Sequence, residues 1–335
     1  MCVATLLDIA EKAGVAKSTV SRALREDPTL SITEETKEKI FSVAEELQYK
    51  MKQEKKLKRC RNIAIVHKDT HFMNQIDNAF YFSIRSAVEE TCYQKNIGFT
   101  FVPYSFLDSF DRQIDGALVV GNFDRKEVDT ICAAVRTGCM VFVGKVNYYP
   151  DRMDWISYSI KDCVYKAMGH LAAMGLKDIA YLGGDDSEDT PEEFSKFSYF
   201  KKFMAEQKQL HFAGSMVGEH GVESGYQMMK RWLREKKAVP DAFFVSNDPI
   251  AIGVIKALNE EGISVPDSVS VISINGDSSG EFSFPALTTV DVHTDAMGRE
   301  AVEILEERIE GKRKLIKKVE YQVTLVTRGS VGKIE

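Results

Sequence analysis

Five polar residues between positions 17 and 22 have side chains suited to binding a nucleic acid. They are Lys17, Ser18, Thr19, Ser21 and Arg22. Directional donors of this kind read base edges in the DNA major groove or bind phosphate oxygens. We expect Lys17, Ser18 and Arg22 to face the bases. We expect Thr19 and Ser21 to bind phosphates, which position a protein without specifying a sequence.

The residues around this cluster predict two short helices joined by a tight turn. Apolar residues recur at helical spacing at Leu6, Ile9, Ala10 and Ala13, Gly14 follows as a turn, and KSTVSRALR resumes a helix. A helix, a glycine turn and a second helix with a hydrogen-bonding outer face form a helix-turn-helix, whose second helix enters the major groove. Ala16 stands at the N-cap of that second helix, where alanine in place of serine costs about 1 kcal/mol.

A third helix and a basic linker complete the N-terminal part of the chain. Thr33 is a candidate N-cap, and the helix after it carries an apolar face that would close a small three-helix core. Residues 50–61 hold seven basic residues and one acidic residue. Residues 1–62 hold 13 Lys and Arg against 10 Asp and Glu, whereas the whole chain of 335 residues has a net charge of -6. A basic head on an acidic body suits a protein that contacts phosphates at one end only.

From Asn62 onward, apolar runs of five to seven residues alternate with helical segments. Such a rhythm indicates parallel sheets covered by helices on both faces, and the number of repeats is too large for one sheet. We therefore predict a helix-turn-helix domain at 1–49, a linker at 50–61 and a two-lobed α/β domain at 62–328. The predicted lobes comprise 62–159 with 291–314, and 160–290 with 315–328.

Polar side chains follow several of the expected strands, and Lys196 opens an expected helix. The residues at or just beyond strand ends are Tyr81, Asn122, Lys145, Asn247, Asp248 and Asn275. Two-lobed α/β proteins bind ligands beyond the carboxyl ends of their strands. Amide and carboxylate groups can form two hydrogen bonds to neighbouring hydroxyls of a sugar, and an aromatic ring can pack against the C–H face of the sugar ring. The residue types found here therefore suit a sugar.

Other classes of protein find little support in the sequence. The six cysteines are scattered and form no C-x-x-C pair, so they read as reduced thiols and imply neither a disulfide framework nor a metal. No cofactor loop or catalytic constellation is visible, so we expect no enzyme activity. The chain lacks a long apolar run and a secretion signal, so we expect a cytoplasmic protein.

The stretch TLLDIAEKAGVAKSTVSR resembles the start of the lactose/galactose repressor family, whose pattern is T-L-x-D-[IV]-A-x-x-A-G-V-S-x-x-T-V-S-R. Further similar motifs run from Asp248 to Gly253, from Gly262 to Ile272 and from Pro285 to Val290. The resemblance implies a two-lobed body like that of periplasmic sugar-binding proteins, a homodimer, an operator with two half-sites, and release from DNA when an effector binds. It implies that Lys17 and Ser18 select the operator sequence and that Arg22 contacts a guanine.

The family inserts a leucine into the DNA minor groove from a hinge helix. The matching leucine here is Leu57, which lies one residue nearer to Tyr49 than the family's usual leucine does. This spacing and E-E-T-K before the third helix resemble the subgroup that represses galactose operons and the evolved β-galactosidase gene. The usual proline, asparagine and alanine of the hinge are missing, and lysines stand in their place. This chain also departs from the family pattern at the effector site. It has Lys196 where the family pattern has an arginine, and His220 where that pattern has an aromatic residue that stacks on the sugar.

Two effectors remain compatible with these changes. The first is a neutral sugar, galactose or a galactoside, as the subgroup implies. The second is an anion such as a sugar phosphate, which Lys145, Lys196 and His220 could pair. A stand-alone sugar-binding protein is the alternative class, and it would have no helix-turn-helix.

Overall fold

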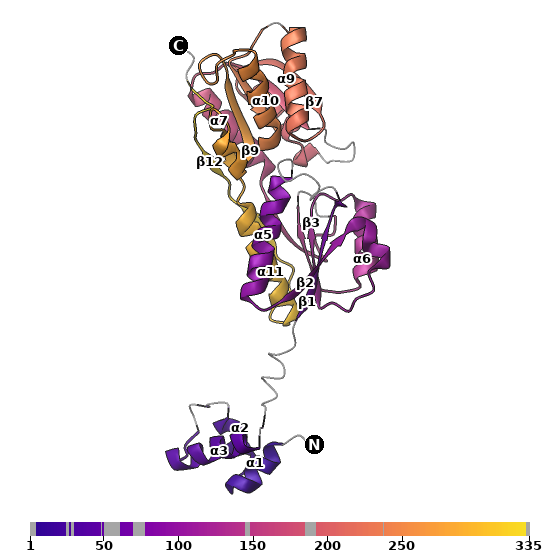
Figure 1. Ribbon diagram of the computed structural model, residues 1–335, viewed down its shortest axis with the longest axis vertical. Coiled ribbons are helices and arrows are strands. Elements are labelled where there is room, and N and C mark those ends of the chain that lie inside the picture. The colour runs from indigo at the N-terminus through magenta and orange to yellow at the C-terminus, as the bar shows by residue number, and fades with distance from the viewer. Residues whose placement is uncertain are drawn as a thin grey trace. The chain divides into compact units, whose positions relative to one another are not determined.

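The computed structural model describes residues 5–24, 27, 30–47, 49, 61–69, 78–144, 148–184, 192–236 and 238–332. It divides into two compact units, Met1–Cys60 and Arg61–Glu335 (Figure 1). We call them the head and the body, and each is described by itself.

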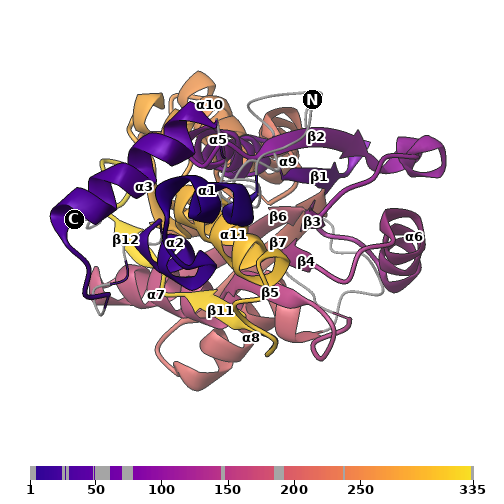
Figure 2. The same cartoon turned by 90° about the horizontal axis from the view of Figure 1, so that it is seen from below.

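The head contains the helix-turn-helix that the sequence predicts. Its helices are α1 (Leu6–Ala13), α2 (Lys17–Ala23) and α3 (Glu34–Glu46), seen together in Figure 2. Thr5 and Asp8 form a capping box at the start of α1, and Gly14 ends this helix with φ at 72°. Ile9, Val20 and Ile40, one from each helix, are fully buried and form the centre of the core.

The two helix starts differ in the way that the sequence indicates. Thr33 Oγ1 accepts a hydrogen bond from the Thr36 backbone N–H at 3.2 Å, so α3 is capped. Ala16 is the N-cap of α2 and supplies no side-chain hydrogen bond. The helix that carries the expected base-reading residues therefore begins without a side-chain cap.

The first lobe of the body is a parallel sheet with helices against it. Its strands lie in the order β2 (Gly98–Pro103), β1 (Asn62–His67), β3 (Gly116–Val120), β4 (Met140–Val143), β5 (Asp154–Tyr158) and β11 (Lys318–Tyr321). The helical segments of this lobe are α5 (Ala79–Gln94), η2 (Tyr104–Ser109), α6 (Arg125–Val135) and α11 (Thr294–Ile309). α6 is not among the helices predicted from the sequence, although Asp124 and Glu127 form a capping box at its start.

The second lobe repeats the same plan. Its strands lie in the order β7 (His211–Gly218), β6 (Asp178–Gly184), β8 (Ala242–Val245), β9 (Ser270–Asn275), β10 (Thr288–Asp291) and β12 (Thr324–Val326). All are parallel except β12, which is antiparallel to β10. The helical segments are α7 (Ile160–Ala173), η3 (Glu192–Phe194), α8 (Lys196–Glu206), α9 (Val222–Lys236), α10 (Asp248–Glu260) and η4 (Ser278–Phe282). The predicted α/β lobes with parallel sheets are confirmed, and β7 and α9 are additions.

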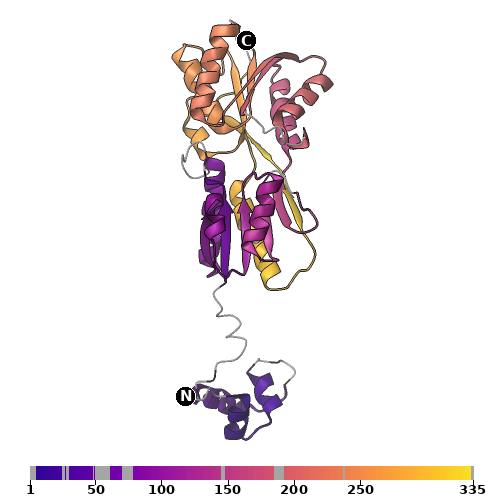
Figure 3. The same cartoon turned by 90° about the vertical axis from the view of Figure 1, so that its right-hand side faces the viewer.

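Within the described residues, three connections cross between the lobes: β5 to α7, β10 to α11, and β11 to β12 (Figure 3). The last strand residues before these crossings are Tyr158, Asp291 and Tyr321. Neighbouring parallel strands end at the same edge of a sheet, so the carboxyl ends of both sheets meet at the crossings. We call this region the lobe junction.

One predicted boundary is wrong. The sequence pattern predicts residues 315–328 in the second lobe, but β11 pairs with β5 in the first sheet, and only β12 joins the second. The cause is the carboxylate of Asp154, which is fully buried at the start of β5. It accepts hydrogen bonds from Arg313 at 2.7 and 2.9 Å and from the Lys317 N–H at 2.6 Å, so the chain enters β11 against the first sheet.

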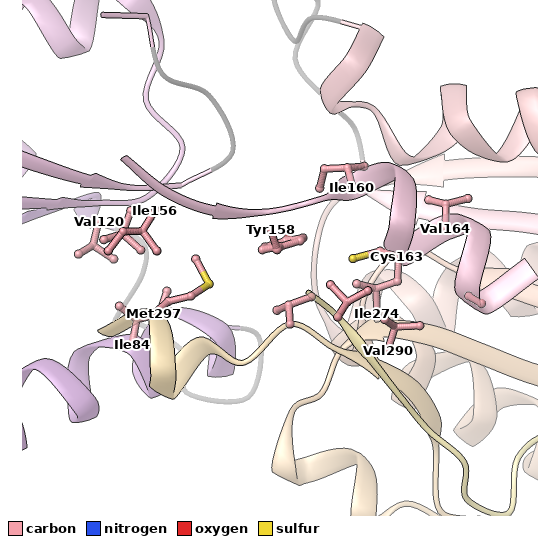
Figure 4. Packing of buried hydrophobic residues seen from close by; sticks show 14 of the residues in the cluster. Ile84, Val120, Ile156, Tyr158, Ile160, Cys163, Val164, Ile274, Val290 and Met297 are labelled. Atoms are coloured by element: carbon pink, nitrogen blue, oxygen red, sulfur yellow. The ribbon is translucent and has the colours of Figure 1, made fainter. Parts of the chain in front are cut away.

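A continuous apolar core passes through the lobe junction. Tyr158 and Ile160 lie on the crossing segment, and Ile84, Met297 and Ile274 pack from the two lobes around it (Figure 4). These side chains are 0–8 % exposed. Complete burial of one such side chain contributes roughly 1.5–3 kcal/mol, so the core holds the crossings in place.

Candidate DNA-binding and effector sites

The outer face of α2 carries the residues expected to bind DNA. Lys17, Ser18 and Arg22 are exposed, while Thr19 and Ser21 are partly buried. The three residues expected to read bases are thus the three most accessible of the five. This surface can present an ammonium, a hydroxyl and a guanidinium to a major groove.

Arg22 is held by an acid that the sequence analysis did not single out. Its Nε donates to Asp27 Oδ2 at 2.7 Å. Asp27 also donates its backbone N–H to the Arg22 carbonyl oxygen at 3.1 Å. Arg22 and Asp27 are five positions apart, whereas side-chain pairs on a helix are expected three or four positions apart. The sequence pattern therefore does not predict this ion pair.

Two predicted site residues, Leu57 and Lys145, lie outside the described residues. The other effector-site candidates fall into two groups at the carboxyl ends of the strands. Tyr81 and Asn122 belong to the first lobe, where Asn122 Nδ2 donates to the Tyr81 hydroxyl at 3.3 Å. Burial raises the pKa of the Tyr81 phenol to about 12, so its proton stays available for hydrogen bonding.

The second-lobe group is built around the carboxylate of Asp248, which is fully buried at the first position of α10. Thr289 Oγ1 donates to its Oδ1 at 2.6 Å, and the Asp277 N–H donates to its Oδ2 at 2.7 Å. The Ser273 hydroxyl also donates to Oδ1. Since Asp248 has no exposed surface and both oxygens are engaged, its position favours support of the loop after β9 over direct contact with a ligand.

A second buried acid lies beside Asp248. Burial and the neighbouring Asp248 carboxylate raise the pKa of Asp277 to about 8, so Asp277 is mostly protonated at neutral pH. Asn275 Nδ2 donates to Asp277 Oδ2 at 3.2 Å, and Asn275 itself is 8 % exposed, with φ at 144°. Burial raises the pKa of Asp248 as well, while its hydrogen bonds oppose the rise. Burial thus disfavours the charged form of both carboxyls, and the pair carries less negative charge than two exposed carboxylates would.

Lys196 supplies the compensating positive charge. It is only 8 % exposed, and its Nζ donates to the Ser246 carbonyl oxygen at 2.6 Å. Its ammonium also acts electrostatically on both Asp248 and Asp277, lowering the pKa of each carboxyl against the effect of burial. The ammonium of Lys196 and the negative charge that the two carboxyls retain therefore offset one another in this part of the lobe junction.

His220 is positioned by Asn247 and by a glycine. Asn247 caps α10, because its Oδ1 accepts from the Ile250 N–H at 2.9 Å. Its Nδ2 therefore faces His220 Nδ1, 3.2 Å away, and donates to it. A Cβ at Gly184 would lie 2.1 Å from the His220 ring, so only glycine admits the imidazole there. An accepting Nδ1 puts the proton of the neutral ring on Nε2, which makes His220 a donor.

Sequence reasoning had placed most of these residues at strand ends, and the structure does bring Lys196, Asn247, Asp248 and Asn275 into one connected region. It had missed Asp277, Ser246 and Thr289 as partners. Asp277 lies two residues after Asn275, the end of a predicted strand, so the same signal could have found it. Ser246 takes part through its backbone carbonyl, which leaves no trace in the sequence.

Two other kinds of feature, metal sites and membrane-spanning helices, find no support among the described residues. Nowhere in the described part of the chain do three or more His, Cys, Asp or Glu side chains gather as metal ligands would. Of the helices found among those residues, none has the length and apolar character needed to cross a membrane.

A helix-turn-helix head, followed by a two-lobed body with polar groups at the lobe junction, defines a DNA-binding transcriptional regulator that responds to a small molecule. Two family models match the chain. Residues 5–51 match the model described as bacterial regulatory proteins, lacI family, and residues 168–331 match a periplasmic binding protein-like domain.

Full-length relatives agree with both models. The HTH-type transcriptional repressor MelR of Bacillus subtilis is 32% identical over 97% of this chain and 96% of its own length. The HTH-type transcriptional regulator GalR of Lacticaseibacillus casei is 31% identical over 97% of this chain and 99% of its own. The chain belongs to the lacI family of bacterial regulatory proteins, whose members named here are regulators and not enzymes.

The fold also matches a solved structure of a whole family member. A lac repressor dimer bound to operator and the anti-inducer ONPF superposes with a TM-score of 0.69, covering 99% of this chain and all of that one. The two sequences are 22% identical, so the match supports the fold alone.

Proposed function

We propose that this regulator represses sugar-utilisation genes and leaves its operator when a neutral sugar, galactose or a galactoside, binds at the lobe junction. The observation that carries the proposal is the charge balance of the junction, where Lys196 is buried against Asp248 and Asp277. The name of the relative GalR supports galactose as the first sugar to test.

The described polar groups favour a neutral ligand over an anionic one. An anion needs a cation whose charge is not already offset. The ammonium of Lys196 donates to a carbonyl oxygen and already interacts with the carboxyls of Asp248 and Asp277. His220 offers Nε2–H from a neutral ring, because protonation of Nδ1 would oppose the Asn247 N–H. Hydroxyl oxygens of a sugar suit both Nε2–H of His220 and the amides of Asn122 and Asn275.

In the head, we assign base reading to Lys17, Ser18 and Arg22 and phosphate contacts to Thr19 and Ser21. Their different exposure on α2 supports this division. Arg22→Ala is expected to remove discrimination at one base pair, a loss of about 1–3 kcal/mol, whereas a phosphate contact would weaken all sequences alike.

We assign the second lobe a role in forming a homodimer. Phe282 and Phe284 are 85% and 87% exposed, and Phe284 lines a depression of about 410 Å³ with Ile252 and Ile255. Large aromatic side chains at this exposure are typical of interfaces. Serine at both phenylalanine positions is expected to give a monomer in sedimentation equilibrium. Two heads would then read half-sites about one turn of DNA, ~34–36 Å, apart.

The release mechanism couples the lobe junction to the linker. A sugar that binds both lobes favours one arrangement of the three crossings, and the energy available for coupling is on the order of 1–3 kcal/mol. Leu57, in the linker, is assigned as the side chain that enters the minor groove and bends the operator. Leu57→Ala is expected to abolish bending, measured by energy transfer between DNA ends, and to leave sugar binding intact. Because its target is operator DNA, we place the protein in the cytoplasm.

Isothermal titration with galactose, lactose and galactose 1-phosphate, each at low and high salt, tests the choice of effector. Binding of a neutral sugar that salt leaves unchanged would support the proposal. Binding of the phosphate ester alone, weakened by salt, would overturn it in favour of an anionic effector.

A further inference from the structure

The ion pair between Arg22 and Asp27 joins a residue assigned to base reading with an acid on the segment that follows α2. The guanidinium Nε donates to Asp27 Oδ2 at 2.7 Å, and the two side chains are 44% and 30% exposed. Exposed ion pairs of this kind contribute little to folding stability. The pair therefore calls for an explanation in terms of what Arg22 does at the protein surface.

Asp27 is fixed by its backbone on both sides. Its N–H donates to the carbonyl oxygen of Arg22 at 3.1 Å, and its own carbonyl oxygen accepts from the Leu30 N–H at 3.0 Å. Leu30 packs against the apolar core of the head. The carboxylate is thus carried by a backbone anchored both to the end of α2 and to the core.

The guanidinium has a covalent shape that makes this contact directional. Its five N–H donors lie in one plane, and the Nε edge is distinct from the edge formed by the two terminal Nη groups. A carboxylate on Nε fixes the plane and points the Nη edge along the side chain. That edge has the spacing of the guanine O6 and N7 acceptors in the major groove.

The charge of Asp27 has a second effect. A carboxylate beside the guanidinium opposes close approach to a DNA phosphate, so it disfavours the sequence-independent contact that an arginine otherwise makes. The ion pair also restricts the rotamers of Arg22 before DNA binds. Less side-chain conformational entropy is therefore lost when Arg22 contacts the DNA.

We infer that Asp27 is a positioning residue that orients the Arg22 guanidinium for guanine and keeps it from phosphate, so that it sets operator specificity without contacting a base. The inference rests on the proposed base-reading role of Arg22. It adds a residue outside the recognition helix to the determinants of specificity.

The test uses the full chain and a duplex selected by the wild-type protein from random sequence. Dissociation constants are measured by fluorescence anisotropy for this duplex, for duplexes with each base pair of a half-site replaced, and for an unselected random duplex. Arg22→Ala first identifies the base pair at which its discrimination is lost. Asp27→Ala is expected to reduce discrimination at that same base pair about fivefold or more, with affinity for the random duplex unchanged or higher.

Two further variants separate positioning from folding. Asp27→Asn keeps an oxygen that can accept from Nε, so it is expected to restore part of the discrimination. Glu46→Ala removes an ion pair of the same head, with Lys12 at 2.5 Å, and is expected to leave the base preferences unchanged. In the double variant, Asp27→Ala is expected to add nothing to Arg22→Ala.

The inference is overturned if Asp27→Ala keeps wild-type discrimination at the base pair that Arg22→Ala identifies. It is also overturned if Asp27→Ala weakens all duplexes equally, random sequence included. If Arg22→Ala itself lowers affinity equally for every duplex, the proposed role of Arg22 fails, and the inference fails with it.

Discussion

The carboxamide of Asn247 links the start of α10 to the ring of His220. Its Oδ1 accepts from the Ile250 N–H at 2.9 Å, and its Nδ2 lies 3.2 Å from His220 Nδ1. Because the cap fixes which end of the amide faces the ring, it also fixes which ring nitrogen carries the proton. A residue at the position of a stacking aromatic in the family pattern thereby becomes an oriented donor.

His220→Phe is expected to weaken sugar binding about tenfold, since one hydrogen bond to a ligand is worth about 1 kcal/mol and the Asn247 amide would lose its partner as well. The measurement is isothermal titration with the sugar that binds most tightly. His211→Phe, at an exposed position on β7, is the matched control and is expected to have no effect. Tighter binding by His220→Phe would show that the ring acts by stacking and would refute the donor role.

Lys196→Met is expected to destabilise the body by about 3 kcal/mol at pH 7, because it leaves the Asp248 carboxylate buried without a cation. At pH 5 the loss should be smaller, because burial raises the pKa of Asp248 and a lower pH favours its neutral form, which needs no cation. Urea unfolding at both pH values measures the difference. Lys202→Met, on the same helix but with a side chain 48% exposed, is the control. Equal destabilisation at both pH values would argue against charge compensation.

Asp277→Asn is expected to change how stability depends on pH. The folded chain keeps the Asp277 proton up to about pH 8, whereas the unfolded chain releases it near pH 4. Between these values the unfolded state binds fewer protons, so this group lowers stability as pH rises. The variant should therefore match the wild type near pH 4 and exceed it at pH 8, by about 5 kcal/mol at most, because each pKa unit corresponds to about 1.4 kcal/mol.

Urea unfolding across this range tests the prediction for Asp277, with Asp267→Asn as an exposed control. Parallel pH profiles for Asp277→Asn and the wild type would contradict the assignment of the proton to Asp277.

Gly298→Ala is expected to loosen the packing of α11 on α5. A Cβ at Gly298 would lie 2.6 Å from the Ile84 carbonyl oxygen and 2.9 Å from the Ala87 Cβ. The backbone must shift to admit it, at a cost of about 1–3 kcal/mol. Gly169→Ala, in α7, has open space around the new methyl group and is expected to stabilise that helix by roughly 0.5–1 kcal/mol. Thermal unfolding of both variants decides the matter, and equal shifts would contradict the close packing at Gly298.

The head could be predicted from sequence almost residue by residue, because its signals are local. The Thr33 side chain caps α3 by accepting from a backbone N–H three residues away, and Gly14 ends α1 at its own position in the chain. The same holds for the strand ends that place Asn247 and Asn275 at the lobe junction. Pattern and position are sufficient where the cause lies within a few residues.

The features that sequence reasoning missed depend on contacts between distant residues. β11 has only four residues, of alternating partial burial, and its sheet is chosen by Arg313 and Lys317 reaching Asp154 about 160 positions earlier. The burial of Lys196 depends on a backbone carbonyl 50 positions away. Neither contact leaves a periodic signal in the sequence. From the sequence alone, a buried Lys196 therefore cannot be distinguished from a lysine that is available to bind a ligand.

The central claim is that a neutral sugar at the lobe junction releases this protein from a specific DNA site. Fluorescence anisotropy of the selected duplex, titrated with protein at increasing galactose or galactoside concentration, tests it most directly. The account predicts that the sugar weakens binding about 5- to 150-fold, the range that corresponds to a coupling of 1–3 kcal/mol. It also predicts that a random duplex is little affected. An operator affinity that no neutral sugar changes, or that only a phosphorylated sugar changes, would contradict the account.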